Sequence, residues 1–275
     1  MARRQATVLE SVEDIRAQIR GAMASREPVD VPASTTEPAQ DTKPFRPTLR
    51  PSMALLCVLD DGDDTGEILR IRASSFVIGR AEGDFLVPHD SGISGRHAEI
   101  SRRFENGERS WHLKDLQSTN GTFVRAATVI LSHEQELLIG SRRFRFEVPA
   151  APTQATPPQG PELSATRKWE AIPGHQAVAT WHATLVDISP GCAGQRFPLT
   201  EPEYWIGRDP HVCSIVIDDP MVDRRHARLY RDGKNRWAMA NAGSRNGLWA
   251  RIQEVGLGRG GFFQCGEQRF FFKVL

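Results

Sequence analysis

Three short groups of residues in the first half of the chain combine a cation, a hydroxyl and an amide. They are Ile78-Gly79-Arg80, Ser94-Gly95-Arg96-His97 and Ser118-Thr119-Asn120-Gly121-Thr122. Arginine presents a planar fork of N–H donors that matches phosphate oxygens, and such charge-assisted bonds are stronger than neutral ones. A serine hydroxyl adds one more donor, and loop amides can complete the cage. The chemistry that these residue types allow is capture of a doubly charged phosphate by loops.

The same groups occur a second time, about 126 to 129 residues further along the chain. The second set reads Ile206-Gly207-Arg208, Asp223-Arg224-Arg225-His226 and Ser244-Arg245-Asn246-Gly247-Leu248. Three landmarks in one order and at a nearly constant offset indicate a duplicated domain.

The elements that position these groups are predicted to be short β-strands. Asn106-Gly107 lies between two alternating runs and predicts a hairpin. The runs 137–140 and 144–148 are expected to close the first unit, and a similar strand pattern returns from residue 183. Many short strands separated by Gly and Asp turns predict an all-β fold with two β-sandwiches.

Low-complexity segments separate the predicted units. The expected organisation is a helix and disordered tether in 1–50, a first domain in 51–148, a proline-rich linker in 149–177 and a second domain in 178–275. Apolar residues at helical spacing predict the N-terminal helix within residues 7–24. Two readings of that helix stay open, a weakly ordered terminus or an element that binds a partner or a second copy of the chain.

Composition restricts the classes of partner. The chain has 275 residues, 39% of them hydrophobic, and a formal net charge of +1. A charge so close to zero gives no electrostatic reason to expect nucleic acid or an anionic membrane. No apolar run reaches the length of a membrane span, and no signal peptide is recognisable, so a cytoplasmic protein is expected. The four cysteines are scattered without metal-ligand spacing, so neither a metal nor a cofactor is predicted.

The ordered set of Gly79-Arg80, Ser94-x-x-His97 and Asn120-Gly121 resembles the signature of forkhead-associated (FHA) domains, β-sandwich modules that bind phosphothreonine peptides. The resemblance covers about 52–148 and again about 178–275. It implies that Arg80 and Ser94 contact the phosphate, with Arg96 as a secondary contact. Thr119 would line the phosphate and methyl pocket, and Asn120 would bond the peptide backbone.

The resemblance also implies residues that shape the loops rather than touch the ligand. These are Gly79, His97 and Gly121 in the first copy, and Gly207, His226 and Gly247 in the second. Gly95 departs from the polar residue often found after the serine of the signature, so one peptide contact is expected to be missing.

The second copy is predicted to be degenerate as a phosphate site. Its candidate residues are Arg208, Asp223, Arg225, Arg245 and Asn246. Asp223 stands where the first copy has Ser94, and a carboxylate about 4 Å from a phosphate oxygen repels it by up to about 4 kcal/mol. Asp223 could instead pair with Arg208, while the neighbouring arginines would partly offset the repulsion. We expect this copy to serve as an interaction or spacing module.

Two functional classes follow from these patterns. The first is a non-enzymatic adaptor that reads threonine phosphorylation, with a Ser/Thr kinase or its substrates as partner. The second is a scaffold, for instance in a secretion or signalling assembly, whose FHA folds bind unphosphorylated partners. An enzyme is not expected, because no P-loop, GxSxG, HExxH or paired-carboxylate motif occurs in a suitable context. Phosphorylation of Thr35, Thr36 or Thr42 could also place a phosphate in the chain's own Arg80 pocket.

Overall fold

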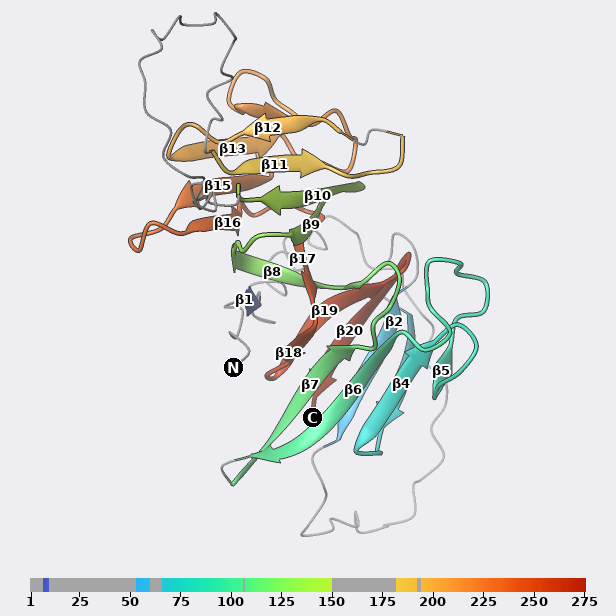
Figure 1. Ribbon diagram of the computed structural model, residues 1–275. Helices are drawn as coiled ribbons and strands as arrows, with labels where there is room; N and C mark the ends of the chain where they lie inside the picture. Colours follow the sequence, from blue (N-terminus) through green and yellow to red (C-terminus); the bar gives the residue numbers. More distant parts are fainter. Residues whose placement is uncertain (1–6, 10–52, 60–65, 106, 150–181, 192–193) are drawn as a thin grey trace, which may run out of the picture.

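The computed structural model describes residues 7–9, 53–59, 66–105, 107–149, 182–191 and 194–275 (Figure 1). Every regular element in these ranges is a strand, which confirms the all-β prediction. The tether, Thr35, Thr36, Thr42 and the linker at 150–177 lie outside the described residues. Among the residues that are described, no helix is present that could cross a membrane.

Two hydrophobic cores organise the strands, named here the first core and the second core. The first core is lined by β2 (Ala54–Leu59), β3 (Gly66–Ile71), β4 (Ser75–Gly79), β5 (Phe85–Leu86), β6 (Ala98–Glu105), β7 (Glu108–Asp115), β18 (Glu254–Gly256), β19 (Gly260–Cys265) and β20 (Gln268–Val274). The second core is lined by β9 (Gln135–Ile139), β10 (Arg142–Glu147), β11 (Thr184–Asp187), β12 (Arg196–Pro198), β13 (Glu203–Gly207), β14 (Ile215–Val216), β15 (Ala227–Arg231) and β16 (Trp237–Asn241).

The first core lies between two layers of strands. One layer is the five-stranded sheet β18-β7-β6-β4-β5, and the other is the run β3-β2-β20-β19 with the start of β8 (Thr122–Ile130). Alternate residues of each strand point inward, as in β2, where Ala54, Leu56 and Val58 are buried. Trp111 of β7 meets Phe272 of β20 across the core, with ring centroids 5.6 Å apart.

The two sequence copies exchange their last hairpins. The hairpin β9–β10, which was expected to close the first unit, pairs with β17 (Leu248–Ile252) and β11 and enters the second core. The hairpin β19–β20 from the end of the chain pairs with β8 and β2 and enters the first core. Figure 1 shows the red strands β19 and β20 beside blue β2, and green β10 beside orange β11. Strand pairing thus crosses the predicted boundary between 51–148 and 178–275.

The crossing points are β8 (Thr122–Ile130) and β17 (Leu248–Ile252), which pair antiparallel between the two cores. Their register is reciprocal, because Thr122 faces Ile252 and Ala126 faces Leu248. Each of the two strands begins in the core that lies next to the loops of its own sequence copy and ends in the other core. In β8, for example, Val124 lies in the first core and Val129 in the second.

The sequence of β8 explains why it does not fold back. A tight hairpin requires residues such as Asn or Gly that adopt positive φ. Neither residue type occurs in Thr122–Ile130, nor in 248–255 of the second copy. Both segments therefore remain extended past the point where a hairpin would turn, and each following hairpin is delivered to the neighbouring core.

The N-terminal prediction is partly wrong. Residues Thr7–Leu9 form strand β1, which pairs antiparallel with β8, for example Thr7 with Val129. A helix over 7–24 therefore does not include its first three residues. Residues 10–24 lie outside the described part of the chain, and self-association through 7–24 stays a prediction.

Candidate functional site

The loops that carry the first set of landmarks meet at one end of the first core, and we call this surface the first rim. Backbone bonds join the loop after β4 to the loop before β6. The Arg80 amide donates to the Ser94 carbonyl at 2.9 Å, and the Glu82 amide donates to the Gly95 carbonyl at 2.9 Å. The loop between β7 and β8 joins them, because the Thr119 amide donates to Ser94 Oγ at 3.0 Å.

Asn120 ties the third loop to the second. Its side-chain Nδ2 donates to the Gly92 carbonyl at 2.9 Å, while Asn120 itself remains half-buried at the surface. Among the described residues, Asn120 Oδ1 accepts no hydrogen bond. One end of the amide is therefore engaged in holding the loop, and the other end has no partner in the described part of the first rim.

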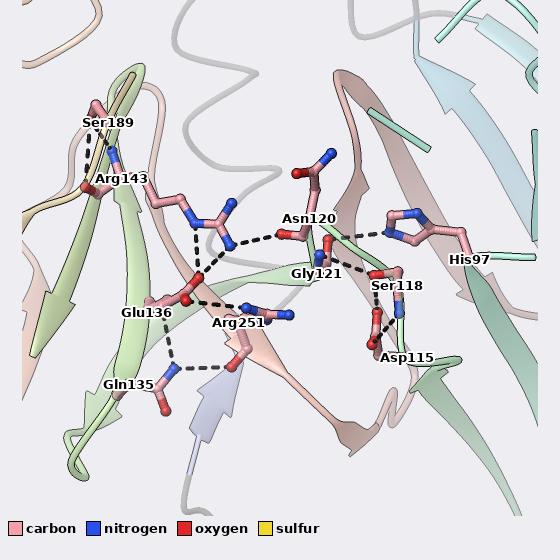
Figure 2. A network of polar contacts seen from close by, with 10 residues as sticks. All are labelled: His97, Asp115, Ser118, Asn120, Gly121, Gln135, Glu136, Arg143, Ser189 and Arg251. Atoms are coloured by element: carbon pink, nitrogen blue, oxygen red, sulfur yellow. Dashed lines mark hydrogen bonds and ion pairs between the residues drawn. The ribbon is translucent and has the colours of Figure 1, made fainter. Parts of the chain in front are cut away.

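His97 is buried beneath the first rim and braces it (Figure 2). Its Nδ1 accepts from the Ser94 amide at 3.1 Å, so the proton lies on Nε2, which donates to the Gly121 carbonyl at 3.2 Å. Burial lowers the pKa of His97, which keeps the ring neutral. His97 therefore joins the loop at Ser94 to the loop at Gly121.

Two glycines of the first rim stand where a side chain would not fit. A Cβ on Gly79 would lie 2.2 Å from the Gly95 carbonyl oxygen and 2.3 Å from that of Glu82. Gly121 has a φ of 86°, and a Cβ there would lie 2.4 Å from Nε of Arg251. The close approach of the loops depends on glycine at both positions.

Sequence reasoning missed the carboxylates that shape the first rim. Asp115 accepts from the Ser118 hydroxyl at 2.6 Å, the Ser118 amide at 3.0 Å and the Thr122 hydroxyl at 2.7 Å. Asp90 accepts from the amide of Gly92 and from the amide of Glu267, which lies in the turn of the exchanged hairpin β19–β20. The Asp115-x-x-Ser118 spacing, typical of a side-chain-capped turn, was the available signal for the first carboxylate. No local pattern indicates the contact with Glu267.

The side chains proposed to meet a phosphate are arranged at the surface. Arg80, Arg96 and Thr119 are exposed, and Ser94 is half-buried. Within the described ranges, the guanidinium of Arg80 has neither an ion pair nor a hydrogen bond. Ser94 Oγ accepts from the Thr119 amide, so its O–H remains able to donate. The first rim therefore presents a cation and a hydroxyl donor to solvent.

Gly95 lies between these groups and leaves space. A Cβ built there meets nothing within 4 Å. The position where the FHA signature often has a polar side chain is therefore open in the first copy.

The second rim, formed by the corresponding loops of the second copy, repeats the frame. His226 accepts from the Asp223 amide at 3.2 Å and donates to the Gly247 carbonyl at 2.9 Å. Burial lowers its pKa as it does that of His97. Asn246 Nδ2 donates to the Met221 carbonyl at 2.8 Å. A Cβ on Gly207 would lie 2.3 Å from the Arg224 carbonyl oxygen.

The second rim differs at the group that replaces Ser94. Asp223 Oδ2 accepts from the Arg245 amide at 2.6 Å, which is the bond that Ser94 makes with Thr119. The carboxylate braces the loop equally well, but it has no proton to donate and carries a negative charge. The predicted alternative, an ion pair of Asp223 with Arg208, is absent from the described part of the second rim. Arg208 is exposed.

Two further arginines of the second rim are engaged elsewhere. Arg224 pairs with Asp209 through two hydrogen bonds, and the position of Asp209 corresponds to Ala81 in the first copy. Arg225 stacks on Trp205, with the guanidinium carbon 3.8 Å from the ring centroid. The second rim thus has the carboxylates Asp209 and Asp223 at two positions where the first rim has Ala81 and Ser94.

Comparison with known proteins finds two families that match two separate segments of the chain, one around each rim. Residues 76–142 match the family described as FHA domain. Residues 191–274 match the family described as inner membrane component of T3SS, cytoplasmic domain. The first match includes β4 to β9 and the first rim, and the second includes β12 to β20 and the second rim.

The curated relatives contain FHA domains by name. FhaB of Mycobacterium tuberculosis, an FHA domain-containing protein, is 38% identical over 72 residues, which are 26% of this chain and 44% of that protein. FhaB of Mycolicibacterium smegmatis is 35% identical over 80 residues, covering 29% of this chain and 49% of that protein. The chain thus spans less than half the length of these relatives.

Among solved structures, one is described as a structural and functional analysis of phosphothreonine-dependent FHA domain interactions. It is 40% identical to the matched part, covers 27% of this chain and 69% of its own, and has a TM-score of 0.21. By these family matches, residues 76–142 are similar to FHA domains, and residues 191–274 are similar to the cytoplasmic part of that T3SS component.

Proposed function

We propose that the chain is a phosphothreonine-dependent adaptor with two FHA-type sandwiches, of which only the first binds phosphopeptide. The observation that carries the proposal is the exposed Arg80 guanidinium, without a carboxylate partner in the described residues, beside a Ser94 hydroxyl able to donate. Arg96, Thr119 and Asn120 complete the binding surface. The match of 76–142 to the FHA domain family supports this assignment.

Each side chain has a distinct task in the proposal. Arg80 supplies the planar fork of donors to the phosphate, and Ser94 adds a short hydrogen bond. Arg96 is a secondary cation at the edge, and Thr119 lines the pocket for the phosphate and the threonine methyl group. Asn120 bonds the peptide main chain, which fixes its direction. No bond is made or broken in the ligand, so the proposed activity is binding rather than catalysis.

The partner is a protein phosphorylated on threonine, either a Ser/Thr kinase or one of its substrates. The proposal involves neither nucleic acid nor insertion into a membrane. A cytoplasmic location suits a protein that binds the phosphothreonines made by such kinases. In this proposal the second domain, with Asp223 and Asp209 at its rim, is a phosphate-independent interaction module.

A second candidate function is a phospho-independent scaffold in which both rims bind unmodified partners. The observation that favours it is the match of 191–274 to a cytoplasmic domain of a secretion component, together with the carboxylate at Asp223. The two candidates differ in what they require of Arg80.

The test is calorimetry of the full chain with a degenerate phosphothreonine peptide library, beside its phosphoserine and unmodified forms. The full chain is used because the first core contains β19 and β20. We expect binding of the phosphothreonine library alone.

The R80A variant should bind this library at least about 100-fold more weakly, because a charge-assisted hydrogen bond contributes about 1.5–3 kcal/mol and the fork makes two. R208A is the matched control and should change nothing. Equal binding of the unmodified library, or full binding by R80A, would support the scaffold.

A further inference from the structure

A side chain on the outer face of β10, a strand that lines the second core, holds the main chain of Asn120 in the first rim. Arg143 lies on β10, the strand that the exchange delivers to the second core. Its Nη2 donates to the Asn120 carbonyl oxygen at 2.9 Å. Figure 2 shows Arg143 reaching this carbonyl while the Asn120 amide group points away from it. The contact therefore leaves the ligand-facing end of Asn120 uncovered.

Arg143 is itself held in one place. Glu136 of β9 accepts from its Nε at 2.8 Å and also from its Nη2, and the guanidinium lies over the ring of Phe123, 5.4 Å from the centroid. The Arg143 and Glu136 side chains are only 24% and 13% exposed. An arginine held by a carboxylate and an aromatic ring loses little further entropy when it binds a carbonyl, so its donor is preorganised.

The same carboxylate holds a second arginine behind the neighbouring residue. Glu136 Oε1 accepts from Nη1 of Arg251 at 3.1 Å, and the Arg251 side chain fills the space next to Gly121. The peptide between Asn120 and Gly121 is thus fixed by Arg143 on its carbonyl and by Arg251 against its glycine. Since Gly121 has a positive φ that few residues adopt, this support selects one orientation of the turn.

The second rim shows that the fold does not require this device. The Asn246 carbonyl accepts instead from the indole Nε1 of Trp249 at 2.7 Å. Arg269 occupies the position that corresponds to Arg143, and its guanidinium lies over Trp249. Phe262 stands where the first copy has Glu136. At the rim that retains Ser94, the arginine that bonds the Asn120 carbonyl is held by a carboxylate, whereas at the second rim an indole donates to the corresponding carbonyl.

We propose that Arg143 is a positioning residue for phosphopeptide binding at the first rim, with Glu136 and Arg251 as its supports. It acts through Asn120 and does not touch the ligand. Strands that line the second core thereby contribute, through side chains on their outer face, to the affinity of the first rim. This inference rests on the proposed function of that rim.

The test compares R143M, which keeps the apolar stem and removes the donors, with R143K, which restores one cationic donor. R145M is the matched control, because Arg145 lies on the same strand and the same face and pairs with Glu147 away from the first rim. Calorimetry of the full-length variants with the phosphothreonine library should show R143M weakened between about 12- and 160-fold, the range of one charge-assisted bond of about 1.5–3 kcal/mol. R143K should recover part of the loss, and R145M should bind as the wild type.

Urea unfolding and the NMR signals of the Asn120 side-chain amide separate positioning from general damage. We expect R143M to unfold near the wild-type midpoint while its Asn120 signals shift or broaden. If R143M binds the phosphothreonine library as tightly as the wild type does, the positioning role is overturned and the proposed function stays intact. A loss in R143M that tracks a lowered midpoint, without recovery in R143K, would also overturn it. A wild type that binds no phosphothreonine peptide would overturn both.

Discussion

The two rims share one frame and differ in the groups placed on it. Both are braced by a buried neutral histidine, an asparagine side chain on a neighbouring carbonyl and a glycine that permits loop contact. The loop bond made by Ser94 in the first rim is made by Asp223 in the second. A carboxylate can replace a hydroxyl as an acceptor but not as a donor. The loop frame can therefore persist when the hydroxyl on it is replaced by a carboxylate.

The first prediction addresses the frame itself, and its effect is all-or-none. Cys57 of β2 faces Phe271 of β20 in the observed pairing. In F271C, oxidation should join residues 57 and 271 within one chain, because directly opposed residues lie within reach of a disulfide. R145C is the control, since Arg145 is the corresponding residue of the hairpin β9–β10, which lies in the second core.

Peptide mapping of the oxidised variants reads the result, in a background where Cys192 is replaced by serine. Cys213 and Cys265 are buried, and burial raises the pKa of both thiols, so they compete little. A 57–145 link in R145C would show that each copy keeps its own hairpin. A link between two chains would show that the exchange occurs in a dimer.

The second prediction makes the first rim resemble the second. S94D preserves the acceptor for the Thr119 amide but adds a negative charge and removes the O–H donor. Repulsion of up to about 4 kcal/mol at 4 Å should lower phosphopeptide affinity by up to about 1,000-fold. Fluorescence anisotropy with a labelled phosphothreonine peptide measures the loss, and S94A, which removes the donor without adding charge, should lose less. Equal losses in both variants would contradict the role of charge.

The third prediction is the reverse change. D223S with R245T places the hydroxyl residues of the first rim beside Arg208 in the second. We expect a second, weaker phosphothreonine site, because Asp209 remains next to Arg208 and still repels the phosphate. Adding D209A should strengthen that new site. If neither variant binds in an R80A background, features other than these carboxylates inactivate the second rim.

The smallest effect concerns pH and tests what the two rims share. Burial lowers the pKa of His97 and His226 below the ordinary value of 6.5, and each Nδ1 faces an amide donor. The unfolded chain therefore binds protons near pH 6.5 that the folded chain does not. The free energy of unfolding should be constant above about pH 7.5 and fall as the pH drops below 6.5, by up to about 1.4 kcal/mol per pH unit for each histidine.

Urea denaturation at pH 7.5 and pH 5.5 measures this slope. H97N and H226N should each reduce it, because each removes one buried histidine, and their reductions should be similar. Stability that increases on acidification would contradict the neutral, bracing histidines seen in both rims.

Much of the site could be read from the sequence because it depends on short-range patterns. The order of Gly79-Arg80, Ser94, His97 and Asn120-Gly121 predicted which loops would meet, and alternation predicted the strands. The exchange of hairpins was not predicted, because a strand's sequence specifies its inward face but not which of two similar cores receives it. The missing turn residues in 122–130 were the available signal. Arg143 and Glu136 could not be found, because they reach the first rim only through that exchange.

The most direct measurement of the central claim is the number of phosphothreonine peptides bound per chain. Titration calorimetry of the full-length protein should give one peptide per chain, and S94D should abolish that binding while D223A leaves the count at one. Two peptides per chain, or one that persists in S94D and vanishes in D223A, would contradict the assignment of phosphate recognition to the first rim.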